Sequence, residues 1–363
     1  MGLARRIAMG IGLHKEFPTW ETNHPTIEMR RRVWYCLYIF DVGAIITFSR
    51  PLDFPDDGID VELPLNIHDS VSSPSGYFEA NVSDTCIQDI TSGTKKSPQS
   101  ANETTVYTHL RAQATFHMAS SQIYSRIISS PFPSATELIE LDDRLIGHWL
   151  ARTPKFFQEN VIQSPKSRLC HSIVSWRYRN FRILMYRPFL VGRLRARSER
   201  GASTAQENEI DFAIQRCLDA ARESVQLISS FWTHEQRSMM ACWYGLYFLF
   251  QAVLIPVICL RNDPQCALAT SWRDQISHAI HVLESMTQLN TTASRCPGVI
   301  PSLCGSYFDP SVDRWGPTEV TANATGESIP IDVANIGNGS FRRYGFGNES
   351  TILDLMNQLP GFE

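Results

Sequence analysis

The sequence predicts an all-α protein: an irregular multi-helix array with a buried central apolar helix and with disordered loop and C-terminal segments. Apolar residues recur at helical spacing along most of the chain, whereas the alternating pattern of strands is almost absent. One apolar run, 243–260, is long enough to form the centre of a core. Stretches rich in Ser, Gly, Asn and Pro interrupt the helical pattern at 66–102 and from 305 onwards.

These shifts in composition divide the chain into three parts. We expect one helical domain over 1–304, which contains a mobile loop at 66–102. A disordered linker over 305–348 should follow it. The last residues, 349–363, return to an amphipathic pattern that includes acidic side chains.

The first long helix is predicted in the stretch that contains EMRRRVWYCLYIFD, in which three consecutive arginines precede an apolar run. Pro25 marks its start, and the Arg50-Pro51 pair follows its end. Helical spacing places a wide apolar face on Val33, Trp34, Leu37, Tyr38, Ala44, Ile45 and Phe48. This stretch therefore predicts a core helix, followed by a proline-rich acidic loop.

The second helical block restarts near Thr104. SATE, at 134–137, is a capping box, and the stripe Leu138, Leu141, Leu145 and Trp149 follows it. Ser164 and Pro165 signal the start of a helix with Trp176, Phe181, Leu184 and Met185 in the core, and Pro188 signals its stop. A second capping box, TAQE at 204–207, opens another helix, and 263–289 supplies one more.

The apolar run 243–260 has about the length that crosses a bilayer. Gln251 and Pro256 interrupt it, however, and the helices on both sides present apolar faces that need a partner. We therefore expect a buried central helix and no membrane, and a membrane-associated helical protein stays as an alternative.

Charge and cysteine usage exclude several classes. The 33 Lys and Arg residues against 37 Asp and Glu residues give the 363-residue chain a net charge of −4, so no global field attracts nucleic acid. The nine cysteines form no C-x-x-C pair, which disfavours a compact zinc site. No secretory signal is apparent at the start, so reduced thiols in the cytosol or nucleus are expected.

Catalytic and cofactor motifs are not found. The sequence contains no P-loop, G-x-G-x-x-G, G-x-S-x-G or H-E-x-x-H motif. His278, His281 and Glu284 share a helical face that could offer metal ligands, but such a face is more often a solvated surface. Cys170 and His171 are adjacent on a helix and point about 100° apart, so they form no catalytic pair. We expect no catalytic residue, no cofactor and no metal in this chain, and an all-helical enzyme of unknown reaction stays as an alternative.

The basic run RYRNFRILMYRPFLVGRLRARSER, 177–200, is the strongest local cluster of positive charge. Its apolar side must face the core, which leaves Arg177 and Arg179 as a solvated flank or as partners in ion pairs. Surface basicity explains the run better than DNA contact does.

The stretch from Ala4 to Pro64 resembles a known family. ARRIAMGIGLHKE, EMRRRVWYCLYIFD and FSRPLDFPDDGIDVELP are similar in order and spacing to the middle homology region of fungal zinc-binuclear-cluster transcription factors, the fungal-specific transcription factor domain. Ser49 stands where the family usually has glycine. RNFRILMYRPFL and CLDAARESVQLI resemble later helices of the family, so the resemblance reaches about Cys304.

The resemblance implies a regulatory domain that controls RNA polymerase II transcription in the nucleus, with a small-molecule inducer as a candidate ligand. Its implied partners are the transcription machinery or co-regulators. Zinc and DNA binding are implied only for an N-terminal cysteine cluster that this chain lacks. The chain is accordingly expected to be a fragment, a truncated gene model or a relative without the cluster.

The resemblance also marks a set of structural residues. They are Arg30, Arg31, Arg32, Trp34, Asp41, Arg50, Pro51, Arg187 and Pro188. The arginines are expected to tie helix ends to loop carbonyls. Asp41 lies within an apolar helix, so we expect it to be buried and paired with one of Arg30 to Arg32 or with Arg50, and a solvent-facing Asp41 stays as the alternative.

The end of the chain, NESTILDLMNQLPGFE, is a candidate activation segment. Its apolar residues at helical spacing are Ile352, Leu355, Met356, Leu359 and Phe362. Acidic residues keep such a segment soluble while its apolar side binds a groove. Two interpretations stay open: the segment binds a transcriptional partner, or it docks onto the helical domain.

Overall fold

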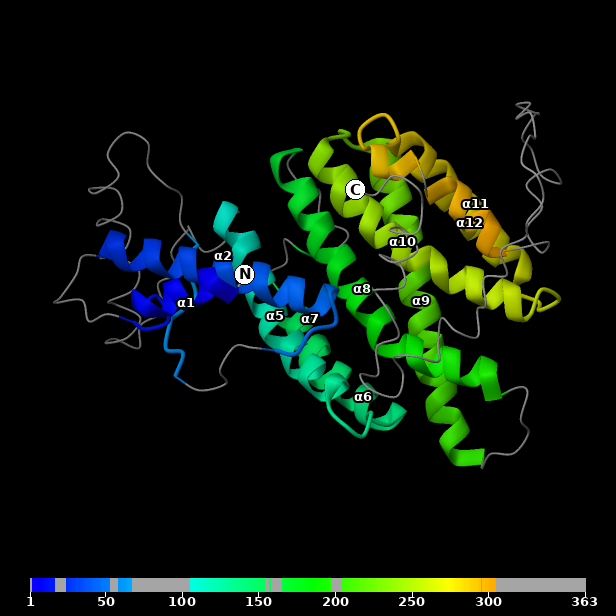
Figure 1. Cartoon of the computed structure of the whole chain (residues 1–363), viewed down its shortest axis with the longest axis horizontal. Coiled ribbons are helices and arrows are strands. Elements are labelled where there is room, and N and C mark those ends of the chain that lie inside the picture. Colours follow the sequence, from blue (N-terminus) through cyan, green and yellow to red (C-terminus); the bar gives the residue numbers. More distant parts are fainter. Residues whose placement is uncertain are drawn as a thin grey trace. The chain divides into compact units, whose positions relative to one another are not determined.

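The computed structural model describes residues 2–16, 24–52, 58–66, 105–153, 157, 165–196, 204–294 and 296–304. The chain splits into two compact units: unit 1 comprises Met1–Ser129 and Leu141–Val174, and unit 2 comprises Ser130–Glu140 and Ser175–Glu363. The described residues are helical with short connections, which confirms the all-α prediction (Figure 1). Among them, the one β-type contact is an isolated bridge between Lys15 and Asp60.

Helix α2 (His24–Thr47) is the centre of unit 1. Helix α1 (Gly2–Gly10) and helix α5 (Val106–Ile128) both pack against it. Trp34, Tyr35 and Ile39 of α2 form a core cluster with residues from both neighbours. The predicted start near Pro25 and the end before Arg50 are confirmed.

The apolar face predicted for α2 is partly wrong. Val33 is 47% exposed and Phe48 is 51% exposed, whereas Trp34, Val42 and Ile45 are buried. Several adjacent positions of this helix are apolar, so spacing alone allowed more than one face. The contacts with α1 and α5 select the face that is buried.

A π-helical turn shifts a second predicted stripe. Helix α6 (Ala135–Leu141) continues into the π-helix η2 (Asp142–Gly147) and then into α7 (His148–Arg152). A π-turn holds more residues than an α-turn, so the buried positions after Leu138 become Asp142 and Ile146. Leu141 and Leu145, predicted in the core, are only half-buried. Trp149 is buried as predicted, and its Nε1 donates to Thr115 Oγ1 at 3.1 Å.

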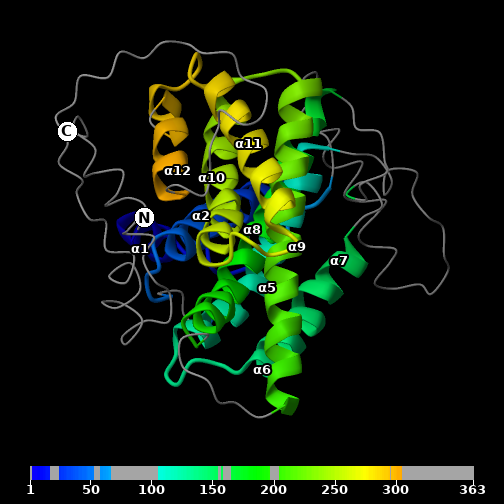
Figure 2. The same cartoon turned by 90° about the vertical axis from the view of Figure 1, so that its right-hand side faces the viewer.

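The core of unit 2 is built around one apolar helix. Helix α10 (Met239–Asn262) packs against α9 (Thr204–His234), α11 (Ala269–Met286) and α12 (Cys296–Cys304). Figures 1 and 2 both show these helices side by side. A short 3₁₀ helix, η4 (Thr291–Ser294), leads into α12. Helix α10 is long and apolar enough to cross a membrane, but 72% of that window is buried, so it is the predicted central core helix.

Helix α8 (Pro165–Ala196) begins at Pro165 as predicted but does not stop at Pro188. Proline removes one donor from the helix, whereas Leu190 beyond it is buried and continues the apolar side. The four residues predicted in its core, Trp176, Phe181, Leu184 and Met185, are all buried.

The arginines of α8 are not a solvated flank. Arg179 is 4% exposed, and its Nε donates to Glu223 of α9 at 2.8 Å, as the ion-pair alternative predicts. The guanidinium of Arg177 lies over the ring of Tyr244, and burial lowers the pKa of Arg177. These two charges therefore support packing within unit 2.

Several expectations lie outside the described residues. These are the loop over 67–102, the linker over 305–348 and the segment 349–363. The prediction of one domain over 1–304 stays a prediction, and the division into two compact units was not indicated by the sequence.

Helices α5 and α8 bring two histidines to one aromatic contact in unit 1. His109 is 6% exposed and meets the ring of Phe157 edge-on at 5.5 Å, and Phe157 stacks on His171 at 5.7 Å. Burial, and then the charge of His171, lower the pKa of His109 from 6.5 to about 4. His109 is therefore neutral in the folded chain at neutral pH.

We predict that acid weakens the chain through His109. Unfolded His109 takes up a proton below pH 6.5 but folded His109 only near pH 4, so its contribution is complete above pH 6.5 and falls between these values. Between pH 7.5 and pH 5 the loss in unfolding free energy should be about 2 kcal/mol. Urea unfolding of the wild type and His109→Gln at both pH values measures it. An equal loss in both proteins would contradict the assignment.

Candidate functional site

The three consecutive arginines of α2 point to three different places. Arg30 Nη2 donates to the carbonyl oxygen of Gly12 at 2.7 Å and to that of Ile11 at 3.3 Å. These carbonyls belong to the turn just beyond the end of α1. Arg30 therefore fixes this turn against α2.

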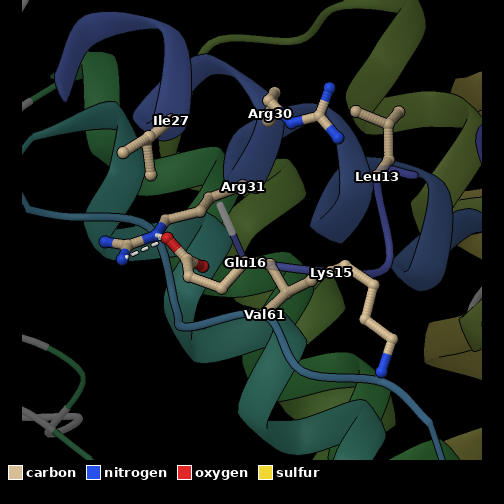
Figure 3. A pocket seen from close by; sticks show the side chains of 7 residues that line it. All are labelled: Leu13, Lys15, Glu16, Ile27, Arg30, Arg31 and Val61. Carbon is tan, nitrogen blue, oxygen red and sulfur yellow. Dashed lines mark hydrogen bonds and ion pairs between the residues drawn. The ribbon is translucent and has the colours of Figure 1, made fainter. Parts of the chain in front are cut away.

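Arg31 holds two acidic side chains. Its guanidinium binds Glu16 through Nε at 3.0 Å and Nη2 at 2.7 Å, and Nη2 also reaches Glu62 at 2.7 Å. Figure 3 shows the contact with Glu16, while Lys15 points away from it. Burial acts to lower the pKa of Arg31, but the hydrogen bonds and charges of the two carboxylates raise it overall.

Arg32 pairs within its own helix. Its Nε donates to Glu28 at 2.7 Å, and its guanidinium lies over the ring of Tyr107 at 3.6 Å. The Glu28 carboxylate also accepts the backbone N–H of Leu65, at 3.0 and 3.1 Å. Burial raises the pKa of Glu28 in spite of these partners, so the pair serves to position the chain more than to stabilise it.

The segment 58–66, called the strap below, is held along its length. Gly58, at φ 84°, adopts a left-handed conformation that favours glycine. Tyr35 donates its hydroxyl to the carbonyl of Val61 at 2.7 Å, and Arg111 donates to the carbonyl of Pro64. At the last residue, Asn66 Oδ1 accepts the hydroxyls of Thr105 and Thr108 at 2.7 Å each.

The strap and the arginines border a small hollow of about 10 Å³, roughly the space for one water molecule. Its lining comprises Leu13, Lys15, Glu16, Ile27, Arg30, Arg31 and Val61 (Figure 3). Pockets that bury a drug-sized molecule usually start near about 300 Å³. The hollow is therefore a seam between packed segments rather than a substrate pocket.

Asp41 is buried and paired with an arginine, but with one that the sequence did not indicate. Arg5 Nη1 donates to Asp41 Oδ2 at 3.0 Å, and the two side chains are 6% and 4% exposed. The expectation of a partner among Arg30 to Arg32 or Arg50 is wrong, because Arg30, Arg31 and Arg32 are directed to the contacts above and Arg50 is exposed. Arg5 lies on another helix, 36 residues away.

Arg50 contributes its backbone rather than its charge. Its N–H bonds the carbonyl of Ile45 at 3.0 Å, and the N–H of Ser49 bonds that of Ile46 at 3.4 Å. This pair of bonds is a Schellman motif, in which Ser49 at φ 50° takes the left-handed position usually held by glycine. Tyr124 of α5 closes the motif, since its hydroxyl donates to the Arg50 carbonyl at 2.7 Å.

The other structural residues that the family resemblance marks lie apart from this cluster. Trp34 is 1% exposed in the core of unit 1, with its ring 6.2 Å from that of His14. Pro51 is exposed beyond the end of α2. Arg187 and Pro188 belong to unit 2, where Arg187 Nη1 donates to the buried Gln251 at 3.4 Å.

The cluster around α2 can hold helices and the strap in place. Its acids are paired with arginines, and no group of three or more potential metal ligands occurs within the described part of the chain. Sequence reasoning missed Arg5, Glu16, Glu62 and Tyr124. Glu16 and Glu62 lie 15 and 31 residues from Arg31, so no local pattern linked them to the arginines.

Comparison with known proteins identifies the class. The model of the fungal specific transcription factor domain matches residues 1–178. An ABC-transporter-regulating transcription factor of Aspergillus fumigatus is 23% identical over 321 residues, which cover 84% of this chain and 32% of the relative. Transcription factor FBD3 of Gibberella moniliformis is 26% identical over 279 residues, which cover 72% and 34%. No solved structure matches the chain significantly.

This chain, whose described residues are mostly helical and contain the arginine cluster, is thus similar to regulators of transcription over most of its length. Residues 1–178 are similar to the fungal specific transcription factor domain, and the relatives named above are similar over 84% and 72% of the chain. The chain spans about a third of the length of the curated relatives named above.

We predict that Ser49→Gly stabilises the chain. A left-handed conformation costs a non-glycine residue roughly 1 to 2 kcal/mol, and the flexibility of glycine in the unfolded chain offsets part of this. The unfolding free energy should rise by about 0.5 to 1 kcal/mol in urea. Ser49→Ala, which keeps the Cβ atom, is the matched control. A loss of stability in Ser49→Gly would show that the serine hydroxyl is required.

We predict that Asp41→Ala lowers the unfolding free energy by about 3 to 5 kcal/mol, because Arg5 is left buried without its carboxylate. Replacing both partners, Arg5→Met with Asp41→Leu, should recover most of this loss, since no buried charge remains. Urea unfolding of the two single variants and the double variant gives the coupling free energy. Additive losses would mean that the pair is not coupled.

Proposed function

We propose that this chain is the regulatory part of a fungal transcription factor and that it acts in the nucleus on RNA polymerase II transcription. The match of residues 1–178 to the family domain carries the proposal. The relatives named above, which are similar over most of this chain, are named as transcription factors, and this supports the same role here.

Contacts with co-regulators or with the transcription machinery fit this chain better than catalysis. Burial raises the pKa of the thiols of Cys217 and Cys259 to about 12 and of Cys296 and Cys304 to about 11, so these thiols are poor nucleophiles. The long apolar helix α10 is packed inside unit 2, which favours a core role over a membrane anchor.

DNA and zinc binding are proposed only for a module outside the described residues. The relatives are about three times as long as the region they share with this chain, which leaves room for such a module. A net charge of −4 gives the chain itself no general affinity for DNA. We propose that an inducer, where one acts, binds at a site other than the hollow beside Arg31, which is too small for it.

A reporter experiment tests the proposal. The full chain is fused to a bacterial DNA-binding domain and expressed in a fungal host with matching operators upstream of a reporter gene. We predict a several-fold change in reporter RNA relative to the DNA-binding domain alone, and loss of this change with Asp41→Ala. Chromatin immunoprecipitation confirms occupancy, and an occupied fusion with unchanged reporter RNA would overturn the proposal.

A further inference from the structure

The connection that follows α5 begins at Ser129. Ser129 is the C-cap of α5, and its backbone, at φ −78° and ψ 160°, is extended. Ser130 and Pro131 continue the connection, and both are exposed, as Ser129 is. Because proline lacks an N–H and disfavours a helical residue before it, the chain leaves the helix here. The last turn of α5 is held weakly, since the N–H of Ser129 reaches the Arg126 carbonyl at 3.3 Å.

Arg126 lies three residues before Ser129 and contacts its hydroxyl. Its Nη1 donates to Ser129 Oγ at 2.8 Å, and the same hydroxyl donates to the Arg126 carbonyl at 2.7 Å. An exposed serine with an arginine three residues before it is the pattern that one large class of protein kinases selects, because an acidic subsite of the kinase binds the guanidinium. Within the described part of the chain, Ser129 is the single serine or threonine that has this pattern.

A second arginine lies beside this end of α5. The Tyr124 hydroxyl donates to the Arg50 carbonyl at 2.7 Å, which places the backbone of Arg50 within about two helical turns of Ser129. The Arg50 side chain is exposed. Helix α5 and the residues 44–52 contain no acidic residue, so no carboxylate from these segments competes for either guanidinium. A negatively charged group at Ser129 would therefore meet two positive ones.

The end of α5 also carries the negative end of the helix dipole, which opposes an anion at Ser129. That end is equivalent to about half a charge, whereas each guanidinium carries a full charge and donates charge-assisted hydrogen bonds. Arg126 is already within hydrogen-bonding distance of the Ser129 oxygen. The two arginines therefore outweigh the dipole at this position.

We propose that Ser129 is a phosphorylation site, that Arg126 is the residue by which a protein kinase selects it, and that Arg126 and Arg50 hold the attached phosphate. In the transfer, Ser129 Oγ forms a bond to the γ-phosphorus of ATP while the bond from that phosphorus to the bridging oxygen of ADP breaks. The hydroxyl proton passes to the catalytic carboxylate of the kinase. The products are ADP and a phosphoserine with a charge of about −2.

Phosphorylation changes the contacts at the end of α5. The phosphoester oxygen can no longer donate to the Arg126 carbonyl, so the last turn loses one of its hydrogen bonds. The phosphate oxygens attract Arg50 toward α5, to which Tyr124 already joins it. The chain passes from unit 1 to unit 2 after Ser129, so the modification lies where the two units are connected in sequence. Its effect on transcription rests on the proposed function, whereas the modification itself does not.

A kinase assay on the full chain tests the site. The chain is incubated with ATP and a calmodulin-dependent protein kinase, which selects arginine three residues before its serine, and mass spectrometry of peptides locates the phosphate. Ser198 and Ser203 also follow an arginine by three residues in the sequence, so their labelling reports that the kinase is active. Ser125→Ala, one turn earlier, removes an exposed serine without this pattern, and Arg152→Gln removes another exposed arginine. These two variants are the matched controls.

We predict that Ser129 is phosphorylated in the folded chain and that Arg126→Gln lowers the initial rate at Ser129 about tenfold or more, because the charge-assisted contact with the kinase is lost. Ser125→Ala and Arg152→Gln should leave this rate unchanged. Urea unfolding verifies that Arg126→Gln is folded. Wild-type chain that is labelled at Ser198 and Ser203 but not at Ser129 would overturn the proposal, and so would an unchanged rate in Arg126→Gln.

Phosphorus-31 NMR tests the contacts of the phosphate with the arginines. The chain carries Ser198→Ala and Ser203→Ala, so that the phosphate on Ser129 is observed without theirs. Free phosphoserine titrates near about pH 6, and guanidinium groups lower this midpoint because they stabilise the dianion. The midpoint should be lower in the folded chain than in urea, and Arg50→Gln should move it part of the way back. Equal midpoints in the folded and unfolded chains would overturn the arginine contacts.

The reporter fusion separates the modification from its regulatory consequence. Ser129→Ala prevents phosphorylation, whereas Ser129→Glu places a negative charge at the same position. Reporter RNA should differ several-fold between these two variants at equal occupancy of the operators. Equal reporter RNA, together with phosphorylated Ser129 in the wild-type fusion, would support the modification and overturn its regulatory role.

Discussion

The buried ion pair between Arg5 and Asp41 is the contact on which the arrangement of unit 1 depends. Helix α1 has nine residues, too few for an isolated helix to be stable in water. Only Arg5 and Ala8 of this helix are buried, so apolar burial contributes little to holding it. Its position therefore follows from the pair with Asp41 at one end and from Arg30 at the other.

Polar side-chain contacts from α2 also position the strap and the start of α5. Arg31 and Glu28 hold the strap, and the strap ends at Asn66, which binds the two threonines at the start of α5. The ends of the segment 67–104 are thereby brought together, so its length has only a weak effect on the stability of unit 1. Each contact is directional and its partners lie on different elements, so the elements have one mutual arrangement.

Much of the fold could be predicted from the sequence because the information is local. Helical spacing, the serine cap of Ser134 on Glu137 N–H, the start at Pro165 and the apolar run of α10 all operate within a few residues. The membrane alternative for α10 was resolved only by its neighbours, which cover it.

What could not be predicted depends on partners distant in sequence or on rare backbone geometry. The partner of Asp41 lies 36 residues away, and nothing near Asp41 identifies it. The π-turn at 142–147 moves the buried positions after Leu138 by one residue, and no residue type in the sequence predicts such a turn. Pro188 is a valid stop signal locally, but the buried residues beyond it favour continuation of the helix. Ser49, the departure from the family pattern, proved informative because the structure places it at a positive φ.

The buried polar residues are distributed unequally between the two units. Among the described residues, unit 1 contains Arg5, Glu28, Arg32, Asp41, Thr105, Thr108, His109, His117, Ser120 and Asp142, whereas unit 2 contains Arg179, Asn180, Ser224 and Gln251. A buried polar group needs a partner of matching chemistry at a fixed geometry, so substitution on one side is costly. An apolar core such as that around α10 tolerates substitution when volume and pattern are kept.

Directional pairs therefore restrict residue identity, whereas apolar packing restricts only residue class. The family model matches residues 1–178, and unit 1 ends at Val174. The region that the family pattern recognises is thus the region whose core is built from specific polar pairs. The relatives are 23% and 26% identical over 84% and 72% of the chain, so the similarity extends beyond residue 178. A core that constrains apolar character more than residue identity permits such low identity. The arginine cluster of α2 is recognisable in sequence for the same physical reason that it holds unit 1 together.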